Sequence, residues 1–150
     1  MRELFVYSDG GARGNPGPAG AGAVIVDDRG ETLREVSQPL GTMTNNQAEY
    51  WAVILILEQV LDLLQTGYVV DRVDYRMDSQ LIVEQLAGNY RVKNLGLKPL
   101  FERVRSLLAR LLVPIEFSHI PRRLNTQADA LANQAMDAVM AGANYHVPTL

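Results

Sequence analysis

The sequence predicts an α/β domain in which a five-stranded mixed sheet carries helices on both faces. Short β-rich runs joined by brief turns fill roughly the first 40 residues, and longer helical runs separate the later strands. Strands joined by short turns form an antiparallel meander, whereas strands separated by helices are expected to run parallel to their neighbours. The expected order of elements is therefore βββαβααβα. No repeat, low-complexity tract or linker indicates a second domain.

The first three strands stand between turn signals. We expect strands at 3–9, 21–27 and 31–39. The glycine- and proline-rich stretch 10–22 is expected to be a turn between the first two, and the segment DDRG is a tight turn before the third.

The remaining elements alternate between helices and strands. A long apolar helix should occupy 45–67, and Gly67 should stop it. Ser79 and either Asn125 or Thr126 are expected to cap later helices. The further elements are strand 72–78, helix 79–88, helix 97–112, strand 114–120 and helix 125–142. We expect residues 1–150 to form one domain, with 141–150 as its tail.

Composition excludes several classes of protein. Cysteine is absent, so disulfides and thiolate metal sites are excluded. No apolar run is long enough to span a bilayer, and the N-terminus lacks a signal-peptide layout, so a cytoplasmic protein without a membrane partner is expected. The net charge of −3 argues against nucleic acid, but 91–123 holds eight basic and two acidic residues, which leaves −9 elsewhere. That segment is either a local basic surface or a solvated helix face.

Four acidic residues stand at the ends of expected strands or near the starts of expected helices. Asp9 and Asp78 end strands, and Glu49 and Asp129 come early in helices. Sites in α/β sheets form at such places. Three of the four have ordinary structural explanations. Asp9 can open a turn, Asp78 can cap a helix, and Asp129 can complete a capping box with Thr126.

Glu49 has no such ordinary explanation. At about 100° per residue it points about 180° away from Glu58 on the polar stripe, and it shares its face with Val53 and Ile56. A carboxylate buried against apolar neighbours needs a cation or a proton, and no Lys or Arg lies within helical reach. A hard ion such as Mg²⁺ or Mn²⁺ shared with other acids would provide it. The alternative is a buried ion pair with a distant arginine such as Arg122.

Four segments closely resemble the signature segments of type 1 ribonuclease H, in the right order and over nearly the whole chain. They are SDGGARGNPGPAGAG, TNNQAEYWA, MDSQLIVEQL and HIPRRLNTQADALAN. The resemblance implies the ribonuclease H-like fold and an endonuclease that hydrolyses the RNA strand of RNA–DNA hybrids, leaving 5′-phosphate and 3′-hydroxyl ends. It implies two divalent ions, Mg²⁺ with Mn²⁺ as the alternative, held by catalytic acids with Asp9 and Asp78 as the central pair. Those acids are Asp9, Glu49, Asp78 and Asp129.

The same resemblance implies residues that contact the hybrid. Small residues after Asp9 permit close approach to a minor groove, and amide side chains can read 2′-hydroxyls there. Thr44 matches a phosphate-binding position on the DNA strand, although capping of the helix is an ordinary additional role. The implied substrate-binding residues are Gly10, Gly11, Ala12, Asn15, Thr44, Asn45, Asn46, Gln80 and Arg122.

Two features depart from the best-known bacterial pattern of that family and suit its archaeal and plant-type branch. The segment AGNYRVKNLGLKPL is too short for the basic handle of many members, and Arg91, Lys93 and Lys98 are a reduced substitute. The flexible loop that carries a histidine in some members is also missing. His119 is expected on a strand, where an isolated histidine is usually structural or merely exposed. Arg122 is the alternative residue that could assist catalysis, and the choice between His119 and Arg122 stays open.

Two other functions remain open at this stage. A non-catalytic module that binds hybrids or double-stranded RNA would share the fold, but clustered acids near phosphates give a pure binder no advantage. A nuclease or transferase acting on DNA would also share it, and fold alone does not exclude that activity. We expect a monomer without an obligate protein partner, and the chain can equally be one domain of a larger protein.

Overall fold

The computed structural model describes residues 2–150. In chain order the strands and helices are β1 (Glu3–Ala12), β2 (Gly17–Val26), β3 (Thr32–Met43), α1 (Asn45–Gln65), β4 (Arg72–Met77), α2 (Gln80–Leu86), α3 (Lys98–Arg110), β5 (Ile115–His119), the short 3₁₀ helix η1 (Arg122–Leu124) and α4 (Thr126–Met140). The expected order of strands and α-helices is confirmed. The 3₁₀ turn between β5 and α4 is the one element that sequence reasoning did not anticipate.

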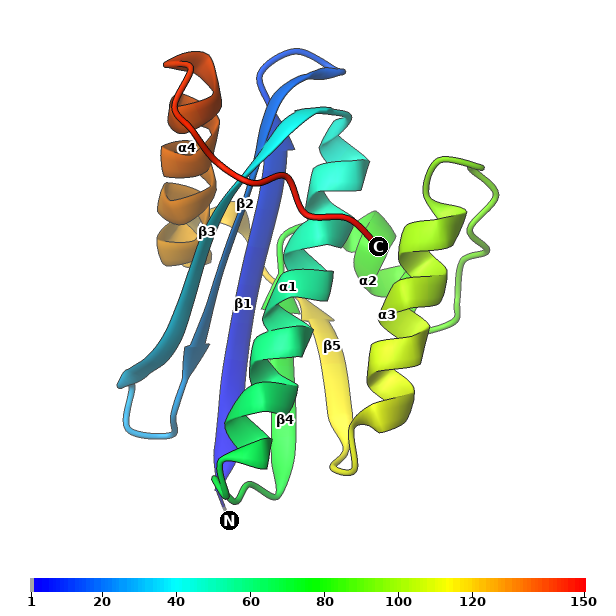
Figure 1. The fold of residues 1–150 in the computed structure, drawn as a ribbon. Coiled ribbons are helices and arrows are strands. Elements are labelled where there is room, and N and C mark those ends of the chain that lie inside the picture. Colours follow the sequence, from blue (N-terminus) through cyan, green and yellow to red (C-terminus); the bar gives the residue numbers. More distant parts are fainter. Residues whose placement is uncertain (1) are drawn as a thin grey trace.

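The five strands form one mixed sheet in the order β3-β2-β1-β4-β5 (Figure 1). The meander β1, β2 and β3 is antiparallel, whereas β4 runs parallel to β1 and β5 runs parallel to β4, as expected. The carboxyl ends of β1 and β4 therefore meet at the same edge of the sheet. Such an edge is where functional residues of α/β sheets gather.

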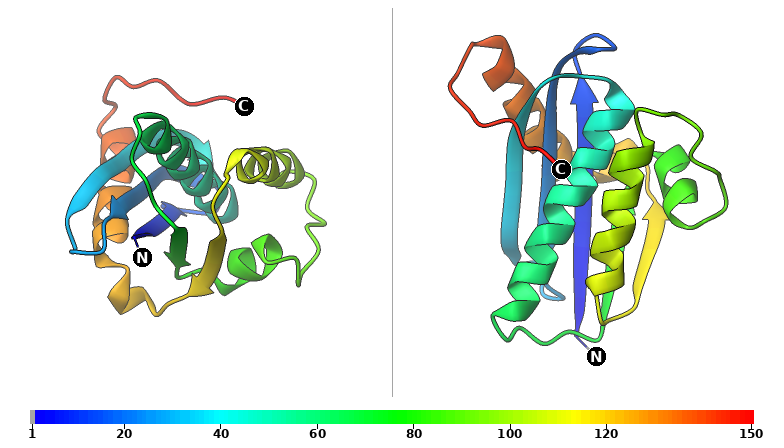
Figure 2. Two further views of the ribbon diagram at one scale, coloured as in Figure 1. Left: turned by 90° about the horizontal axis from the view of Figure 1, so that it is seen from below. Right: turned by 45° about the vertical axis from the view of Figure 1, so that its right-hand side comes forward.

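Helices cover both faces of the sheet, with α1 and α3 on one side and α4 on the other (Figure 2). Successive strand residues face opposite sides, and β1 shows this directly. A Cβ at Gly10 would collide with the backbone of Ala48 in α1, whereas one at Gly11 would meet the side chain of Met136 in α4. The end of β1 is thus enclosed between two helices.

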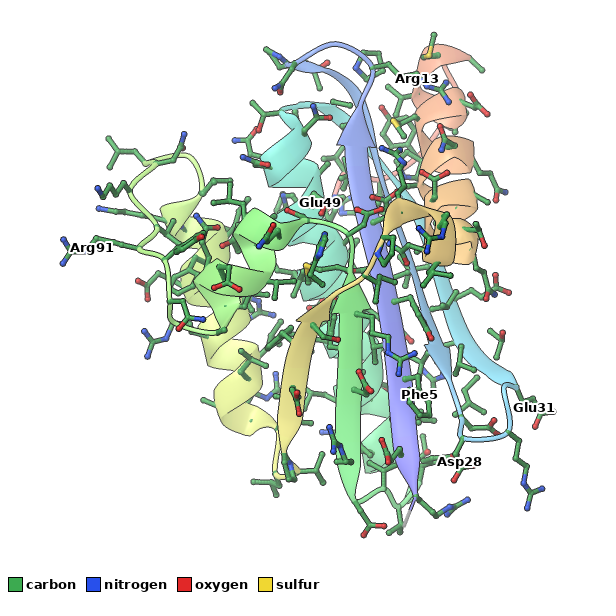
Figure 3. All side chains as sticks on the ribbon, turned by 180° about the vertical axis from the view of Figure 1, so that it is seen from behind. Phe5, Arg13, Asp28, Glu31, Glu49 and Arg91 are labelled. Atoms are coloured by element: carbon green, nitrogen blue, oxygen red, sulfur yellow. The ribbon has the colours of Figure 1, made fainter. Side chains whose placement is uncertain are left out.

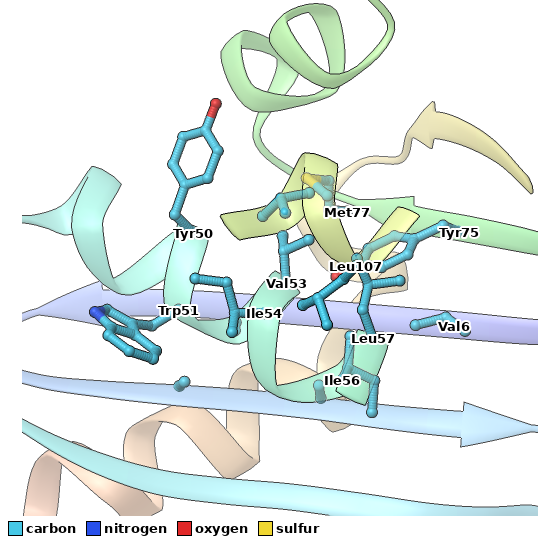
Figure 4. Close-up of a cluster of buried hydrophobic side chains, with 14 of the residues drawn as sticks. Val6, Tyr50, Trp51, Val53, Ile54, Ile56, Leu57, Tyr75, Met77 and Leu107 are labelled. Carbon is cyan, nitrogen blue, oxygen red and sulfur yellow. The ribbon is translucent and has the colours of Figure 1, made fainter. Parts of the chain in front are cut away.

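The hydrophobic core lies between the sheet and the pair α1 and α3 (Figure 4). Val6 of β1, Tyr75 of β4 and Leu107 of α3 are at most 1% exposed and surround the buried side of α1. The outward positions of α1 carry charges that pair with other elements. Glu58 bonds Arg103 at 3.2 Å, and this contact helps to dock α3 beside α1.

The expectation of a turn over residues 10–22 is wrong in its extent. β1 continues to Ala12 and β2 begins at Gly17, so Gly10 pairs with Ala21 and only 13–16 form the connection. The glycines are needed because helices press on both faces of these strands. A Cβ at Gly20 would lie 2.7 Å from the carbonyl oxygen of Ala132 in α4.

β3 also runs further than expected, to Met43 instead of position 39. A register shift beside Pro39 lets pairing resume at Gly41, which has a φ of 70° that glycine adopts without strain. The segment after α4 has no regular structure, but it passes β3, where Gln38 Nε2 donates to the carbonyl oxygen of His146 at 2.8 Å. Among residues 2–150, no helix is long and apolar enough to cross a bilayer.

Candidate active site

Glu49 lies near the start of α1 and is 8% exposed, as its place on the apolar face predicts. A capping box begins the helix, because Thr44 Oγ1 accepts from the Gln47 N–H and the Gln47 side chain accepts from the Thr44 N–H. The expected cap is therefore confirmed. This start places Glu49 against the end of β1, where the Gly10 N–H donates to Glu49 Oε1 at 2.5 Å.

Three of the four candidate acids converge at the carboxyl ends of β1 and β4. Asp9 lies near the end of β1, and Asp78 follows β4 directly. One carboxylate oxygen each from Asp9, Glu49 and Asp78 can be chosen so that all lie within 4.8 Å of one another. Figure 3 shows Glu49 beside the end of β1. Ser79, and not Asp78, supplies the side-chain cap of α2, so capping does not explain Asp78.

Burial and mutual repulsion make this acid cluster costly without a cation. Burial, followed by the charge of Asp78, raises the pKa of Asp9 from 3.8 to about 6. Burial and the nearby Asp9 raise the pKa of Glu49 well above its ordinary value. Asp78 Oδ2 is buried, and no hydrogen-bond donor within residues 2–150 satisfies it. An all-oxygen donor set with an unsatisfied carboxylate oxygen fits a hard divalent cation.

Asp129 lies beside the three acids, next to Asp9. It stands in the first turn of α4, where Arg122 Nη2 donates to its Oδ1 at 3.0 Å. Asp129 is still close enough to contribute to the raised pKa of Asp9. The alternative of a buried ion pair between Glu49 and Arg122 is therefore wrong. Arg122 pairs with Asp129, and none of the ion pairs within residues 2–150 involves Glu49.

The start of α4 is held by an unexpected contact. Asn125 occupies the N-cap position, but its side chain makes no capping bond. Its Nδ2 instead donates to the carbonyl oxygen of Ser8 at 2.9 Å, and the residue is 1% exposed. The predicted capping box between Thr126 and Asp129 is thus not formed. Asn125 fastens α4 to β1 immediately before Asp9.

The acids open into a surface cleft of about 420 Å³. Its wall includes three candidate substrate-binding residues of β1 and a fourth from α1, together with Arg122. The lining residues are Asp9, Gly10, Gly11, Ala12, Arg13, Asn45, Glu49, Asp78, Ser79, Arg122, Asn133 and Met136. Sequence reasoning expected Ser79 only as a helix cap, and it missed Arg13, Asn133 and Met136. The nearness of these three residues to the cluster depends on how α4 packs against the sheet, and no local sequence pattern predicts that packing.

The candidate amide residues also organise the rim of the cleft. Asn45 Oδ1 accepts from the Ala12 N–H at 2.8 Å, and Asn15 Oδ1 accepts from the Asn45 N–H at 3.0 Å. These bonds use the carbonyl end of each amide, so each Nδ2 stays free to donate to another group. A second hollow of about 250 Å³ adjoins this rim and is lined by Asn15, Thr44, Asn46, Gln47, Asn94 and Leu97.

Two candidates line neither of these hollows. Gln80 is exposed at the start of α2 and lines neither of them. His119 is exposed at the end of β5, opposite Met77 in the parallel register, and its part in catalysis stays a prediction. Arg91 and Lys93 are exposed on the loop after α2, on the other side of Glu49 from α4, as Figure 3 shows for Arg91.

Comparison with known proteins agrees with this geometry. The profile of the family described as "Reverse transcriptase-like" matches residues 7–135. "Ribonuclease HI" of Halobacterium salinarum is 41% identical over 134 residues, which cover 89% of this chain and 64% of that protein. "Bifunctional protein Rv2228c" of Mycobacterium tuberculosis is 41% identical over 142 residues, or 94% of this chain. The chain spans only 37% of the length of that mycobacterial protein.

Solved structures share both the fold and much of the sequence. The crystal structure of LC11-RNase H1 in complex with an RNA/DNA hybrid is 44% identical, with a TM-score of 0.85, and the match covers 91% of this chain and 99% of that one. The chain belongs to the type 1 ribonuclease H family.

Proposed function

We propose that this chain hydrolyses the RNA strand of RNA–DNA hybrids at internal phosphodiester bonds, leaving 5′-phosphate and 3′-hydroxyl ends. The observation that carries the proposal is the convergence of Asp9, Glu49 and Asp78 in an open cleft, with a buried Asp78 oxygen left unsatisfied in the described chain. The similar protein LC11-RNase H1 has been crystallised with an RNA/DNA hybrid, which supports the same substrate class here.

The acid cluster suits two divalent ions, which we take to be Mg²⁺ with Mn²⁺ as the alternative. Asp9, Glu49 and Asp78 would hold them, and Asp129 would join from α4. When bound, such ions can activate a water molecule and stabilise the leaving oxygen of an in-line displacement. They would also offset the burial and the negative charge of Asp78, which raise the pKa of Asp9.

The chain's own groups would position the hybrid. Gly10, Gly11 and Ala12 present a wall with little side-chain bulk, which allows a nucleic-acid backbone to approach closely. The free Nδ2 groups of Asn15 and Asn45 can donate to 2′-hydroxyl oxygens at the same rim. Donation to a 2′-hydroxyl is the feature that would distinguish RNA from DNA.

The other candidate contacts lie around this wall. Thr44 and Asn46 border the second hollow, where a phosphate of the DNA strand would bind. Gln80 lies near the mouth of the cleft, at the start of the helix that follows Asp78. Arg91, Lys93 and Lys98 have no ion-pair partner within residues 2–150, so they remain available for phosphates further along the duplex.

Arg122 would act beside the acids. It donates to Asp129 and lines the cleft, so its guanidinium can approach a substrate phosphate without leaving its partner. Its delocalised charge is stable at every physiological pH, and several N–H donors remain free after one is used. We therefore place Arg122, which lines the cleft, next to the reacting phosphate, and not His119, which does not line it.

A strand-resolved cleavage assay tests the proposal. A hybrid carrying a different label on each strand is incubated with the protein in Mg²⁺, in Mn²⁺ and in chelator, beside an all-DNA duplex and a double-stranded RNA. We expect the RNA strand alone to be cut, only with metal, and Asp78→Asn to remove the activity. Binding without cutting would instead support a non-catalytic module, and cutting of the DNA duplex would support a DNA nuclease.

A further inference from the structure

Arg13 joins the β1–β2 connection to α4 at the wall of the cleft. Its backbone N–H donates to the carbonyl oxygen of Pro18 at 2.9 Å, so its main chain belongs to the hairpin. Its side chain crosses to α4, where Nη1 pairs with Asp137 Oδ1 and lies 3.1 Å from the sulfur of Met140. Nη2 donates to Oδ1 of Asn133 at 3.1 Å. Figure 3 shows Arg13 beside this helix.

Asn133 carries the contact on to the acid site. Its Nδ2 donates to the backbone carbonyl oxygen of Asp129, one helical turn earlier, at 2.9 Å. Arg13 and Asn133 both line the cleft that contains Gly10 and Gly11. One series of hydrogen bonds therefore runs from the side chain of Arg13, in the β1–β2 connection, through Asn133 to the backbone of Asp129, the fourth acid.

The rest of the contact between α4 and the sheet provides proximity but few directional bonds. Gly20 and Gly22 of β2 lie directly against Ala128 and Ala132, and contacts between such small residues fix a distance without fixing the position along the helix axis. In the first half of α4, directional bonds come from Asn125 to Ser8 of β1, and from Gln127 and the Leu131 carbonyl oxygen to side chains of β3. In the second half of the helix, the bonds to the hairpin come from Arg13.

We propose that Arg13 is a positioning residue, which holds the second half of α4 against the hairpin and so sets both the width of the cleft and the place of Asp129. The inference rests on the proposed nuclease function. The rival role for a cleft arginine is direct binding of a substrate phosphate. The two roles differ in what Asp137 does, because Asp137 completes the tether in the first role and competes with the phosphate in the second.

The test compares Arg13→Ala, Asp137→Asn and the double variant with a matched control. Arg34 of β3 pairs with Asp62 of α1 at 2.8 Å, with side-chain exposures of 28% and 61%, against 34% and 68% for Arg13 and Asp137. Arg34→Ala therefore removes a similar ion pair away from the cleft. Arg13→Lys serves if Arg13→Ala does not fold, because one amine keeps the charge but cannot reproduce the planar fork.

Cleavage of the labelled hybrid is measured as kcat and KM, and hybrid affinity is measured by fluorescence anisotropy in chelator. For Arg13→Ala we expect kcat to fall by about ten- to a hundredfold, the scale that small misplacements of reacting groups produce. Asp137→Asn should also lower kcat, and the kcat of the double variant should be no lower than that of Arg13→Ala. Arg34→Ala should keep the wild-type kcat.

Amide hydrogen exchange in chelator, without substrate, gives a second readout that does not depend on activity. Arg13→Ala should speed exchange at Gly11, Ala12 and the second half of α4, and Arg34→Ala should not. Unchanged hydrogen exchange in Arg13→Ala would overturn the positioning role of Arg13, whether or not the wild-type protein cuts hybrids. A wild-type protein that cuts no hybrid would overturn only the proposed function. Tighter hybrid binding by Asp137→Asn, with weaker binding by Arg13→Ala, would overturn positioning in favour of a phosphate ligand. Additive losses of kcat in the double variant would also overturn it.

Discussion

Replacing Asp9 with Asn should make the protein more stable when no metal is present. Asn keeps the shape of the side chain but removes a charge that burial and the nearby Asp78 disfavour. The pKa of Asp9 rises from 3.8 to about 6 on folding, which corresponds to a penalty of about 3 kcal/mol once the carboxyl group is ionised. For a chain of this length, such a change would raise Tm by roughly 6–12 °C. The value is an upper bound, because Glu49 can share the proton that relieves the strain.

The pH dependence gives this prediction its sign. Because the folded-state pKa of Asp9 lies above the unfolded value, the folded protein holds an extra proton between about pH 4 and pH 6. The stability that this proton contributes is present below about pH 4 and is lost as the pH rises through about 6. The difference in Tm between Asp9→Asn and wild type should therefore be small at pH 4 and should level off above pH 7.

Thermal melting in chelator from pH 4 to pH 9 measures this difference. Asp62→Asn is the control, because it removes a carboxylate that is 61% exposed and should change stability by less than about 1 kcal/mol. Adding Mg²⁺ should stabilise the wild-type protein and have little effect on Asp9→Asn. An Asp9→Asn protein that melts at or below the wild-type temperature at pH 8 would show that ionising Asp9 in the folded protein does not carry the cost that its burial and the nearby Asp78 imply.

Three further substitutions test the site and the basic rim. Asp78→Asn should abolish cleavage while leaving the metal-free Tm level or higher, and near wild-type turnover would remove Asp78 from the metal site. Glu49→Gln should weaken Mg²⁺ binding in calorimetry and lower turnover by orders of magnitude. The fold should be kept, because the amide oxygen of Gln can still accept from the Gly10 N–H. A large loss of stability with turnover preserved would make Glu49 a structural residue. Replacing Arg91 and Lys93 with Ala should weaken hybrid binding and reduce the slope of log affinity against log salt by roughly one per charge removed, and an unchanged slope would identify a solvated face.

Hydrophobic periodicity and the positions of turn residues in the sequence were enough to predict the order of the elements and the direction of each strand. Apolar spacing identified α1 and α3, and the helices on either side of β4 and β5 required parallel pairing. The convergence of Asp9 and Asp78 follows from that topology, because both stand at the ends of parallel neighbouring strands. Glu49 joined them because a carboxylate on an apolar face needs a partner from elsewhere in the fold.

The position of α4 could not be predicted in the same way. Resemblance to the family grouped Asp129 with the other three acids, and here Asp129 bonds Arg122 and lies next to Asp9, beside the group of Asp9, Glu49 and Asp78. Its place depends on side chains that reach α4 from distant parts of the chain, namely Arg13 and Ser37, and on the inward turn of Asn125. None of these contacts leaves a periodic or capping signal in the sequence.

Two local rules of sequence reading fail in this chain at the same place. Gly10 and Gly11 look like a turn but belong to a strand, and Glu49 looks misplaced on an apolar helix face. Both exceptions have one cause, because helices approach the end of β1 from its two faces, and one of them delivers a carboxylate to the Gly10 amide. The β3 extension past Pro39 is different, since a bulge explains it and no cleft residue depends on it. The exception at Pro39 is explained by a bulge within β3 itself. The exceptions at Gly10 and Glu49 are explained only by the contact between these two residues. Such coincident exceptions are expected where function overrides local preference.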